Sequence, residues 1–197
     1  MSDDIISFNT NEQVKKQLGI RELYQLVPEN DPILREVMPE WDFKNPPEDA
    51  VQLASNLVDT CMHHRGYGLS ANQCGLRHRV FVMGANEEYV AFFNPKIVST
   101  LGETHMIEGC LSFPLLGLRI TRPQEIEVEY QDYNGTVRNA KYTGISARCF
   151  QHELDHMNGI VYTSRVKPLA LQQGMKKRNK LKNMVKKMDK NLKKITK

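Results

Sequence analysis

No stretch of this sequence is hydrophobic enough to cross a membrane. A membrane-spanning helix needs roughly 18 or more consecutive apolar residues, and no run approaches that length. The first residues, MSDDIISFNTNEQVKK, lack the basic start and the apolar stretch of an export signal. We therefore expect a protein without a membrane span. Because no transit segment is visible either, we expect it in the cytoplasm of a bacterial or phage-infected cell.

Cysteine is sparse and irregularly placed, at Cys61, Cys74, Cys110 and Cys149. A chain of 197 residues can bury a core that needs no disulfide scaffold. We therefore expect reduced thiols, each of them either a small buried hydrophobic residue or a metal ligand.

Nucleotide-binding motifs are absent as well. Neither GxGxxG nor GxxxxGK[ST] occurs, and predicted strands and helices do not alternate regularly. A dinucleotide-binding or P-loop fold is therefore not expected. The length suits one domain of ordinary size plus an appendage.

Local patterns predict several elements of secondary structure. Apolar residues recur at helical spacing from Glu48 until Gly66. A second helix is predicted from about Ser146, a candidate N-cap, to Asn158, with Gly159 as its stop. The other predictions are a short helix at 10–18, an irregular proline-rich segment at 27–47, strands at 79–84 and 89–98, and a hairpin at 125–142 turning at Asn134-Gly135.

The stretch QHELDH, residues 151–156, places His152 and His156 one helical turn apart. Both imidazoles can therefore converge on one ion. Glu153 follows His152 directly, so its side chain lies beside the face of the helix that carries the two histidines. From there it can reach a water at the metal without being a ligand, which suits a general base. Taken alone, the motif fits equally well an ordinary helix with two exposed or hydrogen-bonded histidines.

A catalytic metal site also needs a third protein ligand and an open position. No His or Glu follows His156, so the third ligand must come from upstream. The stretch EGCLSFP, residues 108–114, places Cys110 between a glycine that allows close backbone approach and a polar turn. A thiolate with two imidazoles suits iron(II) or zinc, although a cysteine standing alone is more often a packed core thiol.

Three segments occur together in one order: GYGLSANQ at 66–73, EGCLS at 108–112 and QHELDH at 151–156. They closely resemble the three signature segments of the peptide deformylases, which usually read GxGLAxxQ, EGCLS and QHExDH. Ser70 stands where the first segment usually has alanine, a small-for-small change that we expect to be compatible with activity. The likeness covers roughly residues 27–165.

The resemblance implies a substrate and a metal centre. Members of the family hydrolyse the N-formyl group on the initiator methionine of new polypeptides and release formate. Cys110, His152 and His156 would hold one divalent ion, with water as the fourth ligand. Family members are generally iron enzymes, so Fe2+ is expected, with Zn2+, Ni2+ or Co2+ as alternatives.

The resemblance also implies catalytic and substrate-binding roles. Glu153 would accept the proton of the attacking water and pass it to the leaving nitrogen. The Gln73 amide and the backbone N–H of Leu111 would stabilise the oxyanion. The substrate-binding residues implied are Gly66, Tyr67, Gly68, Glu108, Leu111, Ile145 and Cys149.

Within this set, the two glycines at 66 and 68 would let the substrate peptide lie alongside the chain as an extended strand. A helix stop followed by a tight turn explains the same glycines. Tyr67 is larger than the aliphatic residue usual at this position, so it bears on the width of the methionine pocket. Asp155 could orient a metal ligand or pair with an arginine, or it could be an exposed helix acid.

These patterns predict an α+β fold in which antiparallel β-sheets wrap around a central helix that carries HExxH. Residues 1–167 would form the catalytic domain, and residues 168–197 a basic amphipathic C-terminal helix. We expect a monomer.

The C-terminal tail differs sharply in charge from the rest of the chain. Residues 174–197 hold 11 lysines and arginines and one acid, whereas the first 173 residues have a net charge of −6. In bacterial relatives such a helix docks on the ribosome, and this tail would suit ribosomal RNA or, as a weaker option, an anionic membrane surface. Alternatively its apolar stripe packs on the body; the stripe comprises Leu181, Met184, Val185, Met188, Leu192 and Ile195.

Two other functions compete with deformylation. An HExxH metallopeptidase would cleave unformylated peptides and would not need Gln73. A catalytically silent relative that binds the ribosome or RNA would not need the metal ligands or Glu153, all of which are present.

Overall fold

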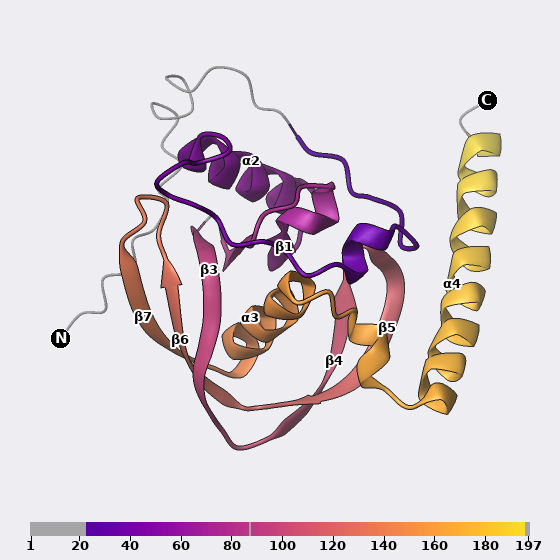
Figure 1. The fold of residues 1–197 in the computed structure, drawn as a ribbon. Helices are drawn as coiled ribbons and strands as arrows, with labels where there is room; N and C mark the ends of the chain where they lie inside the picture. Colours follow the sequence, from indigo (N-terminus) through magenta and orange to yellow (C-terminus); the bar gives the residue numbers. More distant parts are fainter. Residues whose placement is uncertain (1–22, 87, 196–197) are drawn as a thin grey trace.

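The computed structural model describes residues 23–195 apart from residue 87, so the short helix predicted at 10–18 lies outside the described residues. Figure 1 shows the fold. The helices are α2 (Ala50–His63), α3 (Gly144–Met157) and α4 (Pro168–Ile195), with 3-10 turns η1 (Pro32–Arg35), η2 (Ala71–Cys74) and η3 (Tyr162–Arg165). The strands are β1 (Gly68–Ser70), β2 (Val80–Ala85), β3 (Glu88–Leu101), β4 (Thr104–Cys110), β5 (Phe113–Arg122), β6 (Glu125–Gln131) and β7 (Val137–Thr143).

The strands form two antiparallel sheets. One has the order β1-β2-β3-β6-β7, and the other is the pair β4-β5. In Figure 1, α3 lies between the five-stranded sheet and the β4-β5 pair. The main core joins these parts, because Phe150 and Leu154 of α3 pack with Phe92 of β3 and Ile120 of β5. The predicted class, α+β with antiparallel sheets, is confirmed.

Helix α2 covers the end of the large sheet that carries β1 and β2. Its first turn is capped by Asp49, whose carboxylate accepts a hydrogen bond of 2.7 Å from the backbone N–H of Gln52. Leu53, Leu57 and Val58 on its inner face are buried in a second core cluster. The helix predicted from Glu48 is confirmed, with its first residue at Ala50.

The hairpin predicted at 125–142 is also confirmed, as β6 and β7. Asp132 organises its turn, because one carboxylate oxygen accepts hydrogen bonds from the backbone N–H groups of Asn134 and Thr136. Gly135 adopts a φ of 80°, which favours glycine at this position of the turn.

Helix α3 begins earlier than its sequence indicated. The N-cap residue is Thr143, not Ser146. Strand β7 runs directly into the helix through Gly144, whose positive φ of 58° turns the chain, so the helix needs no serine cap to start. Its end is as predicted: Gly159 has a φ of 68°, and a Cβ there would lie only 2.6 Å from the carbonyl oxygen of Arg35.

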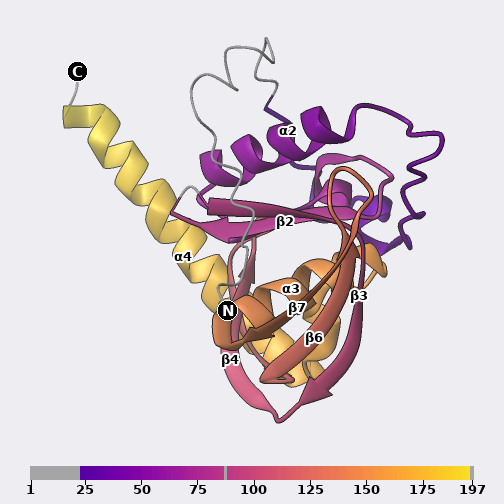
Figure 2. The ribbon, with the colours of Figure 1, turned by 90° about the vertical axis from the view of Figure 1, so that its left-hand side faces the viewer.

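Among the described residues, the contacts of helix α4 with the body come from its first half. A Cβ at Gly174 would lie 2.7 Å from a Leu118 methyl group of β5, so glycine permits this close contact. The buried Arg178 side chain donates a 2.9 Å hydrogen bond to the Pro114 carbonyl and pairs with Glu29. The C-terminal part of the helix extends away from the body (Figure 2).

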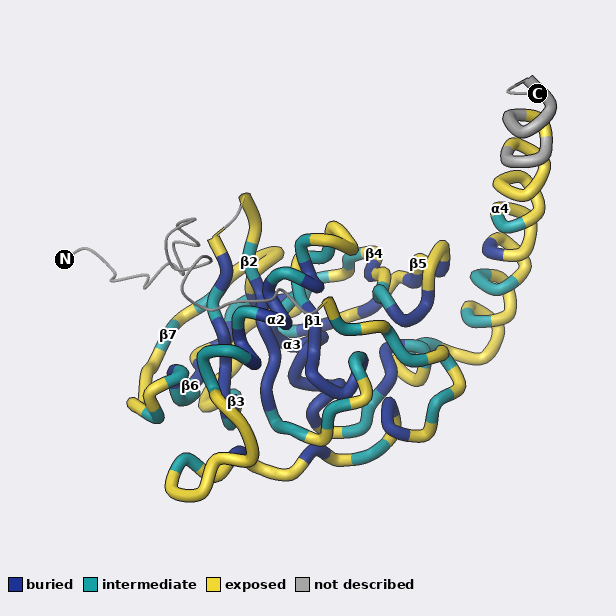
Figure 3. The backbone as a smooth tube through the Cα atoms, turned by 90° about the horizontal axis from the view of Figure 1, so that it is seen from above, coloured by how far each residue is buried: buried dark blue, intermediate teal, exposed yellow. Residues whose placement is uncertain are grey.

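The part of the apolar stripe whose side chains the structure describes, from Leu181 to Met188, is therefore not buried against the described body. Its members Leu181, Met184, Val185 and Met188 are between 37% and 57% exposed. Figure 3 shows that buried residues gather around α3 and β1, whereas most of α4 is exposed. Among the described residues, no helix combines the length and apolarity needed to cross a bilayer.

Candidate active site

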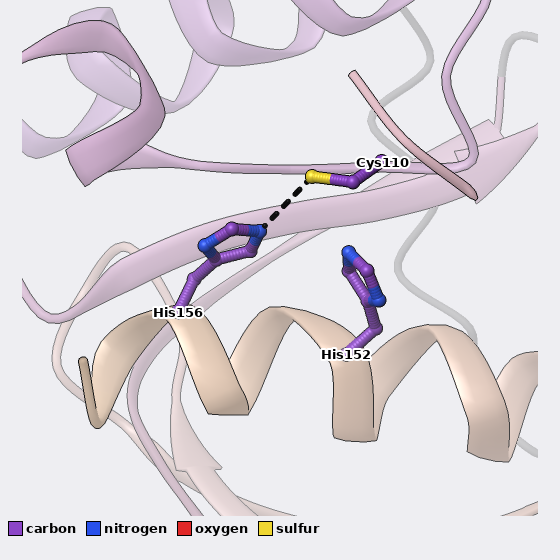
Figure 4. Close-up of side chains that lie close together, drawn as sticks. All are labelled: Cys110, His152 and His156. Atoms are coloured by element: carbon purple, nitrogen blue, oxygen red, sulfur yellow. Dashed lines mark hydrogen bonds between the residues drawn. The ribbon is translucent and has the colours of Figure 1, made fainter. Parts of the chain in front are cut away.

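Three potential metal ligands converge between α3 and the end of β4. His152 and His156 extend from one face of α3, and Cys110 approaches them from the strand (Figure 4). The Cys110 Sγ lies 3.3 Å from His156 Nε2, and the three donor atoms lie within 4.8 Å of one another. Donor atoms around a tetrahedral zinc ion are about 3.3 to 3.6 Å apart, so the arrangement fits a cation.

The surroundings of the two histidine rings shift their pKa values in opposite directions. Burial lowers the pKa of His152, but its hydrogen bonds with Cys110 and Glu108 outweigh this and raise the pKa to about 10. Burial lowers the pKa of His156 well below its ordinary value, which keeps that imidazole in the neutral, metal-binding form. Positive charge is therefore stabilised on His152, whereas His156 offers a neutral ring nitrogen.

Cys110 owes its position to the tight connection between β4 and β5. It is the last residue of β4 and pairs with Phe113 across a register shift, so only two residues separate the strands. The neighbouring Gly109 does not mediate a close approach as the sequence indicated. A Cβ there would meet nothing within 4 Å.

Glu108 orients His152 from beneath the site. Its Oε2 lies 3.1 Å from His152 Nδ1, and since a carboxylate only accepts, the ring nitrogen donates. Arg122 and Arg148 donate to the same carboxylate, each with a shortest distance of 2.6 Å. Burial alone would raise the pKa of Glu108, but the bonds from Arg122 and His152 outweigh it and lower the pKa well below its usual range.

Asp155 is buried and paired with arginines. Its carboxylate accepts a 2.8 Å hydrogen bond from Arg122 and further bonds from Arg165. Arg122 therefore bridges Glu108 and Asp155, and it links the strand under the site to the metal-binding helix. The sequence allowed three roles for Asp155: orienting a metal ligand, pairing with an arginine, or lying exposed on the helix. The structure shows the pairing with arginine.

Glu153 lies fully inside the protein beside the metal ligands. Its Oε2 accepts a 2.7 Å hydrogen bond from the Ser70 hydroxyl. A Cβ at Gly68 would lie 2.5 Å from Glu153 Oε1 and 2.8 Å from Cys149 Sγ, so Gly68 makes room for the carboxylate. Burial raises the pKa of Glu153, against the opposing influence of His152 and Ser70.

Gln73 lies on the other side of the cysteine sulfur. Its Nε2 donates to Ser112 Oγ at 3.0 Å and lies 3.4 Å from Cys110 Sγ. Its Oε1 accepts a hydrogen bond from the backbone N–H of Ser70. The amide is thus fixed with its donor side toward the metal ligands.

These groups open into a cavity of about 460 Å³. All seven residues that the sequence indicated for substrate binding line it, and so do Gln73, Cys110, His152 and Glu153. Tyr67 is 66% exposed and stands at the rim, so its bulk does not fill the cavity. A second cavity of about 470 Å³ lies beyond the wall formed by Tyr67, Ile145 and Cys149.

Sequence reasoning missed the arginines. Arg122 and Arg148 stand at no motif spacing, yet they hold Glu108 and, through it, His152. The signal available was indirect: a glutamate and an aspartate inside buried motifs need cationic partners. Nothing local says which arginines supply them.

Residues 23–172 match the family described as polypeptide deformylase. The chain belongs to the peptide deformylase family. The peptide deformylase of Thermotoga neapolitana is 36% identical over 148 residues, which cover 74% of this chain and 88% of that one. The solved deformylase from Legionella pneumophila superposes with a TM-score of 0.75 at 30% identity, over 83% of this chain and 97% of that chain. For the deformylase from Thermotoga maritima, the TM-score is 0.69 at 35% identity, with 75% and 99% coverage.

Membership in this family decides between the competing functions. Peptide deformylases are enzymes that hydrolyse the N-formyl group of the initiator methionine on nascent polypeptides and release formate, and this is the activity of the chain. The group of Cys110, His152 and His156 supplies a possible metal site for it. An unrelated HExxH peptidase and a silent RNA-binding relative are not needed to explain the sequence.

Proposed function

We propose that Cys110, His152 and His156 hold the one divalent ion of this deformylase. The observation that carries the proposal is the convergence of their donor atoms within 4.8 Å, at the wall of a cavity that Glu153 also lines. When bound, the ion acts as a Lewis acid that makes a water nucleophilic at neutral pH and polarises the formyl carbonyl. Fe2+ is the ion proposed, with Zn2+, Ni2+ and Co2+ as alternatives, because a thiolate and two imidazoles suit all of these.

Glu153 is the proposed general base and acid. Its Oε2 is occupied by Ser70, which leaves Oε1 at the cavity wall to accept the proton of the attacking water. The same carboxyl group then gives that proton to the leaving amine nitrogen. The raised pKa of Glu153 supports both transfers, because the group must be deprotonated before attack and protonated after it.

The oxyanion that develops at the formyl carbon needs hydrogen-bond donors, and we assign this role to Gln73 and Leu111. The Nε2 group of Gln73 lies beside Cys110, and both residues line the cavity. The backbone N–H of Leu111 follows Cys110 directly in the chain. Donors held in place before the reaction can stabilise the transition state by about 3 to 4 kcal/mol each.

The cavity would receive the methionine side chain of the substrate. Its proposed lining consists of Tyr67, Leu111, Ile145, Cys149 and the stem of Glu108. The peptide that follows would run as an extended strand along the backbone of 66–68.

The test uses protein purified without oxygen, because oxidation of Cys110 would remove a ligand. Metal content per chain is measured together with formate release from formyl-Met-Ala-Ser, and acetyl-Met-Ala-Ser and free Met-Ala-Ser serve as controls. We expect one metal ion per chain and release from the formyl peptide alone. Cleavage of the unformylated peptides, or full activity without metal, would contradict the proposal.

We further propose that residues 1–167 form the catalytic domain, and that the basic helix at 168–197 binds ribosomal RNA. The exposed lysines of α4, among them Lys186 and Lys187, support RNA binding, as does the projection of the C-terminal part of the helix from the body (Figure 2). In this proposal the enzyme is a cytoplasmic monomer that meets its formylated substrate as the new chain leaves the ribosome.

A further inference from the structure

Ser70 contacts both of the side chains proposed to carry out proton transfer and oxyanion stabilisation. It is fully buried at the end of β1, where it pairs with Phe81 of β2. Its hydroxyl donates a 2.7 Å hydrogen bond to Glu153 Oε2, and its backbone N–H donates a 2.9 Å hydrogen bond to Gln73 Oε1. One residue fixed in a sheet thus holds two groups that come from different elements.

The carboxylate is the preferred acceptor of the hydroxyl proton. Ser70 Oγ also lies 3.2 Å from the backbone carbonyl of Glu153, but a hydroxyl has only one proton to donate. The bond to the carboxylate is shorter, and hydrogen bonds to an ionised acceptor are the stronger kind. The hydroxyl therefore points to Glu153 Oε2.

This contact determines which carboxylate oxygen is free. Oε2 is tied to the sheet through Ser70, whereas Oε1 lies over Gly68 at the cavity wall. Without the hydroxyl, the carboxylate could turn about its terminal bond, which has only a weak rotamer preference. Oε1 would then leave the position from which it reaches water in the cavity.

We propose that Ser70 is a positioning residue for deformylation, which fixes the Glu153 carboxylate through its hydroxyl while its backbone holds the Gln73 amide. The inference rests on the proposed role of Glu153 as general base. The proposed role also explains why this chain has a serine at position 70, where the signature segment that it resembles usually has alanine. The hydroxyl is thus an additional support for the catalytic glutamate in this chain.

The test is Ser70→Ala, which removes the hydroxyl but keeps the backbone bond to Gln73. A hydrogen bond to a charged group has a free energy that corresponds to about a tenfold effect or more, so we expect kcat for formyl-Met-Ala-Ser to fall about tenfold. KM and metal content should stay unchanged, because the cavity and the ligands are intact. Ser164→Ala is the matched control: its hydroxyl donates to the Val161 carbonyl outside the cavity, and kcat should not change.

The same substitution made in the Glu153→Gln variant distinguishes an effect on the carboxylate from a general effect on the structure. If Ser70 acts through the carboxylate, Ser70→Ala should have no further effect on the residual rate of Glu153→Gln. An unchanged kcat in Ser70→Ala, a loss of metal, or the same tenfold loss in both backgrounds would overturn the inference. Failure of the proposed function would look different, because Glu153→Gln itself would then keep wild-type activity.

Discussion

The Glu108 carboxylate and the His152 imidazole are joined by a 3.1 Å hydrogen bond between Oε2 and Nδ1. Because Nδ1 donates to Glu108, Nε2 is the ring nitrogen of His152 that remains to bind a metal ion. Glu108 is itself fixed by Arg122 and Arg148. The orientation of one metal ligand therefore depends on an ion network that reaches from β5 to α3.

We expect Glu108→Gln to weaken metal binding about 10- to 100-fold, as is typical when the group that orients a histidine ligand is changed. The amide keeps the shape but loses the charge that faces His152 and two arginines. Affinity can be measured by competition with a chelator of known strength. The exposed Glu103→Gln is the control and should bind metal like the wild type. Equal affinity in both variants would mean that Glu108 does not orient the ligand.

We expect Glu153→Gln to retain its metal but to lose about 10²- to 10⁴-fold in kcat. The amide cannot accept the proton of water, whereas the three ligand side chains remain unchanged. Metal analysis and formate release on the same sample check both parts. Cys110→Ala provides the opposite pattern, since it should lose the metal itself. A Glu153→Gln protein that is inactive only because it lacks metal would contradict the assigned role.

Arg178 should anchor α4 to the body. Its buried guanidinium donates to the Pro114 carbonyl and pairs with Glu29. We expect Arg178→Ala to reduce the free energy of unfolding by about 1 to 3 kcal/mol, because the Pro114 carbonyl loses its partner and the packing is lost. Limited trypsin digestion should also release the C-terminal segment sooner. Lys177→Ala, at the exposed neighbouring position, should change neither result.

Binding of α4 to the ribosome should depend on its exposed lysines. Reversing two charges in Lys186→Glu, Lys187→Glu should weaken cosedimentation with ribosomes, and the residual binding should be less sensitive to salt. Hydrolysis of a short formyl peptide should be unaffected, since both lysines lie beyond the attached half of the helix. Lys44→Glu, Lys96→Glu changes the net charge equally on the body. Equal loss of binding in both double variants would point to net charge rather than to α4.

The sequence predicted the elements whose signals are local. Helix α2 has a capping aspartate and one apolar face, and the β6-β7 hairpin has an Asn-Gly turn, so both were found. Strand β5 was missed although Leu116, Leu118 and Ile120 alternate with exposed residues, a period-two pattern. Its strand signal is weak because Pro114 and Gly117, two residue types that disfavour strands, interrupt the pattern.

In the site, too, the residues with a local sequence signal could be predicted, and those brought together only by the fold could not. The metal ligands could be predicted because a helical turn brings two histidines together and the signature segments supply Cys110. The support around them could not, because Arg122 and Arg148 reach Glu108 only after β4, β5 and α3 have packed together. The contact between Ser70 and Glu153 spans 83 residues, and only the fold brings the two side chains together.

Alkaline pH should destabilise the protein through its buried thiols. Burial raises the pKa of Cys74 to about 12, from an ordinary value of 9.0, and it also raises the pKa of Cys61 and Cys149. Because the pKa is higher in the folded state, this stability is fully present below about pH 9 and is lost as the pH rises toward 12. Each thiol should contribute a loss of about 1.4 kcal/mol per pH unit in that window.

Urea unfolding under reducing conditions, repeated at several pH values between about 8 and about 11, measures this loss. In Cys74→Ala the unfolding free energy should fall less steeply with pH, because alanine does not titrate and one thiol no longer contributes. This holds whatever the substitution does to stability at neutral pH. The slope rather than the absolute free energy is the test, since a smaller side chain also changes packing. A slope identical to that of the wild type would mean that Cys74 ionises equally in the folded and unfolded states.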